Sequence, residues 1–372
     1  MDIREWKSLA LRSVCLLVAV LLIGAAGTVF GGGAAQTGEK SAAMEAGEEP
    51  VPGEEVSNIE RVDAQNIEEQ AAEQIDKRYI KLEKVVTGQA ISASLENDYM
   101  NFSLILTLEG NGARRYHARS VQRQYGKKHY TGDGHGGKDP VKSIQDIAGK
   151  NSVRFVMKMN RIYEPSLLET DSAWYIVLDK PWEVYEHIVV VDAGHGGSDE
   201  GTGSVGWKYR EKEYALCVAA GLKKILDGTD IKAYYTRLED VEVTKEERVR
   251  LANSVRADAF ISIHCNASDQ TETTANGVEA LYSTRKRASG MQLTSKALAE
   301  NILEQVCAIT GRRKRKTIRR NDLYLMHHSK VPVTIVEVGY MTNASDMRYL
   351  LREKNQMEFA RGIYLGLVKS FD

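Results

Sequence analysis

The sequence predicts an α/β fold: a mostly parallel sheet flanked by helices on both faces forms the C-terminal part, preceded by a small β-rich domain and an N-terminal transmembrane segment. Three observations predict this arrangement. Short apolar runs alternate with stretches of helical periodicity after Ile188, alternating or β-branched runs occur within residues 78–186, and an uncharged apolar run spans Val14–Phe30. Strands that alternate with helices imply a largely parallel sheet covered on both faces.

Length and charge divide the chain into parts. Its 372 residues suit two domains of ordinary size. The formal net charge of −1 hides an acidic segment, residues 36–77, which holds three basic and twelve acidic residues. We expect a membrane anchor or signal segment at 1–35, an acidic linker at 36–77, a β-rich domain at 78–186 and the α/β domain at 187–372.

The first segment is interpreted from its charges. Arg4, Lys7 and Arg12 precede the apolar run, and the next basic residue is Lys40. About 20 apolar residues cross a bilayer as a helix, and flanking basic residues stay on the cytoplasmic side. We therefore expect export of everything downstream and favour an uncleaved anchor; a signal peptide cleaved near Gly33–Ala35 is the alternative.

The next two parts differ in composition. The acidic, aromatic-poor residues 36–77 predict a solvated spacer. Residues 78–186 suit a small β-sandwich, because Asn101–Leu108, Ser152–Met159 and Ala173–Leu178 read as strands bounded by turn formers.

Regular elements follow one another from Ile188 onward. The capping box Thr244-Lys245-Glu246-Glu247 predicts the start of a helix that runs to about Arg256. The other expected elements are strands at Ile188–Val191, Ile231–Thr236, Ala259–Ile263 and Val333–Val338, and helices at Glu211–Leu226, Gln292–Ile309 and Ser345–Lys369.

Four polar residues are expected to converge at one edge of this sheet. His195 follows the first strand, His264 ends the third, Glu337 lies in the last, and Glu211 begins the helix after a glycine-rich loop. Ligands bind at the carboxyl ends of strands in such sheets. Two imidazoles and one carboxylate make a catalytic zinc set, and a second carboxylate can take a proton from the zinc-activated water.

Each of these residues also has a structural explanation when taken singly. His195 and His264 can be ordinary loop or core histidines, and Glu211 can be a favourable partner of a helix dipole. Glu337 is harder to explain in this way, because a carboxylate inside an apolar strand is costly without a partner.

Residues 188–371 resemble the catalytic domain of zinc-dependent N-acetylmuramoyl-L-alanine amidases (amidase family 3). The motifs that carry the resemblance are, in order, VVVDAGHGG, REKEYAL, YYTRLEDVEVTKEERVRLAN, ADAFISIHCNA, GVEALY and LYLMHHSKVPVTIVEVGYMTN. The resemblance implies that His195, Glu211 and His264 bind Zn²⁺ and that Glu337 is the catalytic carboxylate. It also implies hydrolysis of the amide between the lactyl group of N-acetylmuramic acid and L-alanine in peptidoglycan.

The partners and location follow from that resemblance and from the export segment. We expect peptidoglycan as substrate, contact with the membrane through the N-terminal helix, and no nucleic-acid partner. The enzyme is expected outside the cytoplasm, anchored or secreted to the cell wall; a protein regulator is left open. Residues 78–186 loosely resemble wall-targeting β-domains, with a plain spacer as the alternative. The alternative functions are another zinc peptidase and a non-catalytic or structural envelope protein.

Three further features are interpreted as structural. Gly134–Gly137 repeats the GHGG of residues 194–197, but the polar stretch before it, Gln122–Thr131, does not predict a strand, so His135 is assigned to a flexible loop. Gly311–Asn321 holds seven basic residues and is expected to be a solvated surface loop, with contact to anionic envelope polymers or stem-peptide carboxylates as the functional alternative. Arg237 is expected to brace the sheet or the residues behind the site rather than to touch substrate.

Overall fold

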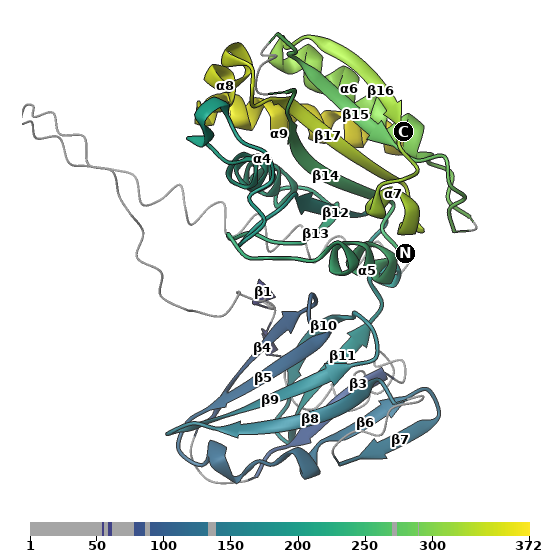
Figure 1. The fold of residues 1–372 in the computed structure, drawn as a ribbon. Helices are drawn as coiled ribbons and strands as arrows, with labels where there is room; N and C mark the ends of the chain where they lie inside the picture. The colour runs from purple at the N-terminus through teal and green to yellow at the C-terminus, as the bar shows by residue number, and fades with distance from the viewer. Residues whose placement is uncertain are drawn as a thin grey trace, which may run out of the picture. The chain divides into compact units, whose positions relative to one another are not determined.

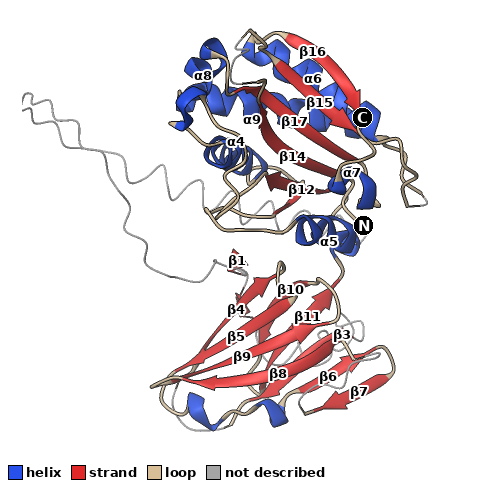
Figure 2. Cartoon of the chain, viewed as in Figure 1, coloured by secondary structure: helices blue, strands red, loops and turns tan. Residues whose placement is uncertain are grey.

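The computed structural model describes residues 54–55, 59–61, 78–85, 90–132, 139–269, 274–288 and 290–372. They form a body made of β-strands and a second body in which strands and helices alternate (Figures 1 and 2). Among these residues, no helix has the length and apolar character that crossing a membrane requires. The expected membrane segment at 1–35 and His135 lie outside the described residues. The expectation that no strand lies within residues 122–131 is wrong, because Gln122–Tyr125 and Lys128–Thr131 pair as two antiparallel strands.

The first body is a β-sandwich. Its elements are β1 (Glu54–Glu55), β2 (Ile59–Arg61), β3 (Arg78–Glu83), β4 (Ser92–Asp98), β5 (Ser103–Glu109), the short helices η1 (Ala113–Arg115) and η2 (Ala118–Ser120), β6 (Gln122–Tyr125), β7 (Lys128–Thr131), β8 (Val141–Ala148), β9 (Ser152–Met159), β10 (Glu164–Glu169) and β11 (Ala173–Asp179). One sheet has the order β1-β4-β5-β9-β8 and the other β2-β10-β11-β3-β6-β7. Leu106 and Phe155 of the first sheet and Ile80 and Trp174 of the second are buried in one shared cluster. Both β1 and β2 lie within residues 36–77, so part of the expected linker pairs with the sandwich.

The second body is built on one six-stranded sheet. Its elements are α3 (Pro181–Val184), β12 (Ile188–Ala193), η3 (Val205–Trp207), α4 (Glu211–Leu226), β13 (Lys232–Tyr235), α5 (Lys245–Val255), β14 (Ala259–Asn266), β15 (Val278–Tyr282), α6 (Ser295–Thr310), β16 (Lys314–Arg319), α7 (Tyr324–His328), β17 (Val333–Tyr340), α8 (Ala344–Leu350) and α9 (Glu353–Phe371). The strand order is β13-β12-β14-β17-β15-β16.

The predicted fold class, with a mostly parallel sheet, is wrong. The sandwich sheets are antiparallel apart from the β2–β10 pair, and the third sheet is mixed because β15 runs antiparallel to β17. A parallel neighbour needs a long crossover, usually a helix. The structure describes no helix between β14 and β15, and the chain returns in the opposite direction.

The expectation of a loop at Gly311–Asn321 is also wrong, because Lys314–Arg319 forms β16. This strand lies at the edge of the sheet and pairs with β15. Because an edge strand can carry many basic side chains, its sequence lacks the apolar pattern by which strands are predicted. Charges of this kind also protect sheet edges from pairing with other chains.

The two faces of the sheet carry different cores, which fixes the position of the site. Ile261 and Ile263 of β14 pack in a cluster that includes residues of α4, α6 and α9, whereas Phe260 packs in a cluster with residues of α5 and α7. Because successive strand residues alternate between faces, Ser262 and His264 lie on the α5 and α7 side, beyond the apolar part of that face.

Candidate metal centre

His195 lies in the loop that follows β12, in a backbone conformation that is uncommon for a residue with a side chain. Its φ angle is 60°, in the left-handed region. The preceding Gly194 is required for a different reason: a Cβ there would lie 2.5 Å from Nε2 of His264. The two histidine rings are therefore placed together, with centroids 4.9 Å apart and planes at 82°.

Two buried arginines hold this loop by its carbonyl oxygens. Arg237 donates from Nε to the oxygen of Ala193 at 3.0 Å and from Nη2 to that of Gly194 at 2.7 Å. Arg248 donates to the oxygens of Ala193 and His195, each at 2.7 Å. The loop is thus over-determined, which is how an uncommon backbone conformation persists in a folded protein. Arg237, which was expected to brace the sheet or the residues behind the site, thus supports the loop that carries His195.

Glu211 is the first residue of α4 and is 4% exposed. Its Oε2 accepts a hydrogen bond from the backbone of Thr202 at 2.8 Å, and its Oε1 accepts one from the backbone of Cys265 at 3.0 Å. These two backbone donors fix the carboxylate, and Oε1 faces the histidines.

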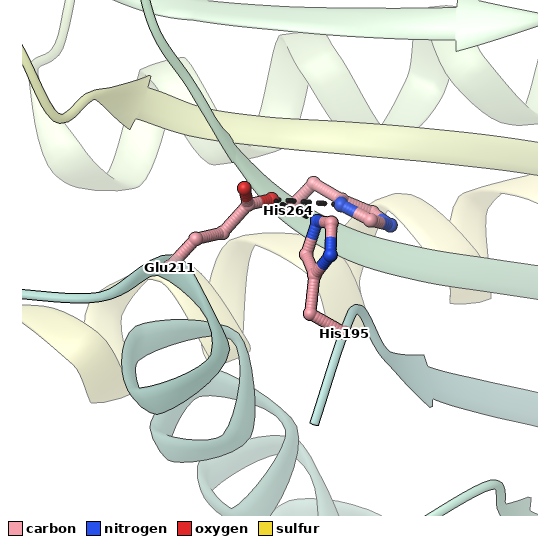
Figure 3. A group of neighbouring side chains, drawn as sticks. All are labelled: His195, Glu211 and His264. Carbon is pink, nitrogen blue, oxygen red and sulfur yellow. Dashed lines mark hydrogen bonds and ion pairs between the residues drawn. The ribbon is translucent and has the colours of Figure 1, made fainter. Parts of the chain in front are cut away.

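The three predicted ligands converge on that oxygen (Figure 3). Nε2 of His195 lies 3.1 Å from Oε1 of Glu211, and Nδ1 of His264 lies 2.8 Å from it. One nitrogen or oxygen from each of the three side chains lies within 4.8 Å of the others, and the described residues contain no other such group of three. The set of two imidazoles and one carboxylate suits a catalytic zinc ion.

The electrostatics of the cluster depend on burial and on these contacts. Burial opposes ionisation of Glu211, yet its hydrogen bonds with His195 and His264 hold the pKa of the carboxyl well below its ordinary value. Burial also lowers the pKa of His264, but the hydrogen bond and charge of Glu211 outweigh this and raise that pKa to about 9. The carboxylate is therefore anionic at neutral pH and attracts a positive charge into the cluster.

Each imidazole has a second polar neighbour behind it. Nδ1 of His195 lies 2.9 Å from Oδ2 of Asp199. Nε2 of His264 lies 3.1 Å from Oγ of Ser262, which donates to Oδ2 of Asp192 at 2.5 Å. Neighbours of this kind orient the ligands of metal sites.

Glu337 lies beside the cluster on the next strand. It is the register partner of His264, so both side chains project from the same face of the sheet. Its Oε2 is buried and has no hydrogen-bond partner among the described residues. Burial raises the pKa of Glu337 to about 7, a value suited to accepting and returning a proton near neutral pH.

The carboxylate on the other side of Glu337 is differently placed. Glu279 of β15 is the register partner of Glu337, and its two oxygens accept hydrogen bonds from Arg315 at 2.6 Å and Asn266 at 3.0 Å. Of these two neighbouring carboxylates, Glu337 is the one with a free buried oxygen.

The residues behind the ligands were not predicted from the sequence; they are Asp192, Asp199, Ser262 and Arg248. Asp192 lies in the apolar strand β12, the same kind of signal that singled out Glu337, and could have been found from it.

Comparison with known proteins identifies the second body. A family model described as N-acetylmuramoyl-L-alanine amidase matches residues 189–369. YqiI of Bacillus subtilis is 32% identical over 184 residues, which are 50% of this chain and 84% of that protein. The chain belongs to the N-acetylmuramoyl-L-alanine amidase family. This family of hydrolases cleaves the bond between N-acetylmuramic acid and L-alanine in peptidoglycan, and residues 189–369 are its amidase domain.

Two further relatives show how far the similarity extends. The N-acetylmuramoyl-L-alanine amidase LytC of Bacillus subtilis is 33% identical over 183 residues, and the match covers 49% of this chain but 35% of LytC. An N-acetylmuramoyl-L-alanine amidase from Clostridium difficile 630, known from its crystal structure, has 30% sequence identity to this chain and a TM-score of 0.46. The match covers 50% of this chain and 97% of that one. The match to LytC thus covers about half of this chain and about a third of LytC.

Proposed function

We propose that this chain hydrolyses the amide between N-acetylmuramic acid and L-alanine of peptidoglycan, with Zn²⁺ held by His195, Glu211 and His264 and with Glu337 as the catalytic carboxylate. The observation that carries the proposal is the convergence of two imidazole nitrogens and one carboxylate oxygen beside a buried, unpartnered carboxylate oxygen on the next strand. The family match agrees with it.

The residues divide the chemistry between them. Zinc bound by the three ligands would lower the pKa of a water molecule and polarise the scissile carbonyl. Glu337 takes the proton of the attacking water on its free Oε2 and returns it to the nitrogen of L-alanine as the C–N bond breaks. Arg237 and Arg248 keep His195 in place through the loop carbonyls.

The variant Glu337→Gln tests this division. It keeps the shape of the side chain but removes the proton acceptor, so hydrolysis should fall by roughly 10²- to 10⁴-fold. Zinc content, measured by atomic absorption, should stay that of the wild type, whereas His264→Ala should lose both zinc and activity. Glu300→Gln on the exposed surface of α6 is the matched control and should change neither. Full activity of Glu337→Gln would refute the assignment.

Two other functions are distinguished by the product. Purified peptidoglycan is digested with and without a chelator, and the products are analysed by mass spectrometry. An amidase releases stem peptides that begin with L-alanine, another zinc peptidase cuts within the stem peptide, and a non-catalytic wall-binding protein releases nothing.

The location and the remaining parts of the chain are also proposals. Because peptidoglycan lies outside the cytoplasm, we place the reaction there, and the basic residues before Val14–Phe30 are typical of exported proteins. We propose peptidoglycan as the partner of residues 187–372 and a wall-targeting role for the sandwich of residues 78–186, with a plain spacer as its alternative; a protein regulator stays an open prediction.

A further inference from the structure

A fully buried carboxylate, Asp192 of β12, lies close to the metal centre without belonging to it. Its Oδ1 accepts hydrogen bonds from Thr236 at 2.6 Å and from Arg248, and its Oδ2 accepts one from Ser262 at 2.5 Å. Oγ of Ser262 lies in turn 3.1 Å from Nε2 of His264. Asp192 and Ser262 therefore form a chain of polar groups that ends on a candidate metal ligand.

The direction of each hydrogen bond in this chain follows from what the atoms can donate. Burial opposes ionisation of Asp192, but the charge of Arg248 and the hydroxyls of Ser262 and Thr236 hold its pKa below the ordinary value. An ionised carboxylate only accepts, so Ser262 donates its single hydrogen to Asp192. Toward His264 the hydroxyl then offers only lone pairs, so Nε2 of the imidazole must carry a hydrogen.

We propose that Asp192, acting through Ser262, is a positioning residue that fixes His264 as the Nε2–H tautomer and so presents Nδ1 to the metal. The proposal rests on the zinc-ligand role proposed above for His264. It agrees with the observed orientation, because Nδ1 is the nitrogen that faces Oε1 of Glu211, at 2.8 Å. Fixing a tautomer through an outer partner is a general device of metal-binding histidines.

The sheet itself builds this chain of contacts. Asp192 and Ser262 are register partners on the parallel strands β12 and β14, and Ser262 and His264 are two residues apart and share a face. Arg248, which pairs with Asp192, also donates to the carbonyl oxygen of His195. One carboxylate thus supports the positions of both histidines, and the test must separate tautomer control from this general support.

Four variants of the full chain make that separation. Ser262→Ala removes the link but keeps the pair of Asp192 and Arg248. Asp192→Asn reverses the direction of the hydrogen bonds. Oδ1 stays with Thr236 and Arg248, whereas the new amide donates to Ser262. The serine hydrogen then points to Nε2 of His264, which leaves the imidazole hydrogen on Nδ1. Thr236→Val is the matched control, because it removes a donor from the same carboxylate without contacting His264. Ser262→Thr keeps the hydroxyl.

The measurements are the dissociation constant for Zn²⁺ alone, by competition with a colorimetric chelator, and ¹⁵N NMR of the zinc-loaded, histidine-labelled wild type. Ser262→Ala should bind zinc roughly 10- to 100-fold more weakly. Asp192→Asn should bind it more weakly still, and Ser262→Thr and Thr236→Val should bind as the wild type does. The wild-type spectrum should place the hydrogen of His264 on Nε2.

Three outcomes would overturn the inference: a hydrogen on Nδ1 of wild-type His264, equal losses of zinc affinity in Ser262→Ala and Thr236→Val, or unchanged zinc affinity in Ser262→Ala. These are distinct from a failure of the proposed function. A wild-type chain that binds zinc but leaves peptidoglycan intact would refute the proposed reaction alone. Unchanged zinc affinity in Ser262→Ala would refute the tautomer control alone. A wild type without zinc affinity would refute both.

Discussion

Replacement of Arg248 by methionine should destabilise the amidase domain by several kcal/mol, because it removes the cation beside a buried carboxylate. The side chain of Arg248 is 6% exposed and that of Asp192 is 0% exposed. Breaking such a pair from one side typically costs about 3–5 kcal/mol, since the remaining charge is left uncompensated. The carbonyl oxygens of Ala193 and His195 lose a charged donor as well, so we expect a loss of about 5 kcal/mol, at the upper end of this range.

Urea unfolding of the full chain at pH 7 measures this loss. The control is Arg361→Met, which makes the same exchange at an exposed position of α9 and should change the free energy of unfolding by less than about 0.5 kcal/mol. If Arg248→Met costs no more than this control, the reasoning from the buried pair is refuted.

The same variant carries a pH dependence with a definite sign. In the wild type the folded-state pKa of Asp192 lies below its ordinary value, so its stabilisation is present above the unfolded pKa of about 3.9 and is lost as the pH falls. Without Arg248, burial raises the pKa of Asp192, and protonation then relieves the variant in acid. The difference in stability should be largest at pH 7 and shrink towards pH 4; a constant difference would contradict this explanation.

Three smaller predictions test the loop, a helix start and the metal. Gly201 has a φ of 68°, and a Cβ there would lie 2.6 Å from Oε2 of Glu211, so Gly201→Ala should cost about 1–2 kcal/mol and weaken zinc binding, as urea unfolding and zinc titration would show. Thr244 caps α5 by accepting from the backbone of Glu247 at 3.2 Å; Thr244→Ala should cost about 1 kcal/mol in the same assay and leave hydrolysis unchanged. A chelator should lower the melting temperature in calorimetry and added zinc should restore it, because a cation that binds only the folded state stabilises it. A melting temperature that does not change when the chelator is added would argue against bound zinc.

The elements predicted best were those with a strong local pattern. The helix at Glu211–Leu226 was predicted with the bounds of α4, and Ser152–Met159 with those of β9. The capping box at Thr244 is confirmed, because its side chain accepts from the backbone of Glu247. In each case the signal, apolar spacing or capping chemistry, is contained in a short stretch of sequence.

The direction of a strand and the presence of an edge strand could not be predicted from local sequence patterns. The direction of β15 depends on how the chain returns from β14, and no residue within β15 encodes it. β16 reads KRKTIR, with four basic residues beside Thr317 and Ile318, and it lies at the edge of the sheet. Its sequence therefore lacks the apolar run that marks a buried strand.

The part of the candidate site that lies at or near the strand ends was predicted from the sequence. His195, Glu211 and His264 lie together, and Glu337 is in register with His264. That each is a ligand or the base stays a prediction. The contacts of Asp192 behind them were not predicted, because they join residues 44 to 70 positions apart whose types are common in proteins for other reasons.

The glycines around His195 show why the site forms as one unit. Glycines in a loop commonly allow a tight turn or the close approach of another group. In the structure, the space beside Gly194 is taken by the ring of His264, and the space beside Gly201 by Glu211 and His195. Each glycine therefore leaves room for a ligand from another element, and Arg237 and Arg248 hold the left-handed backbone of His195 through the loop carbonyls. Because the three ligands are packed against one another and against these glycines, a change at any of them should alter metal affinity before it alters the fold of the sheet.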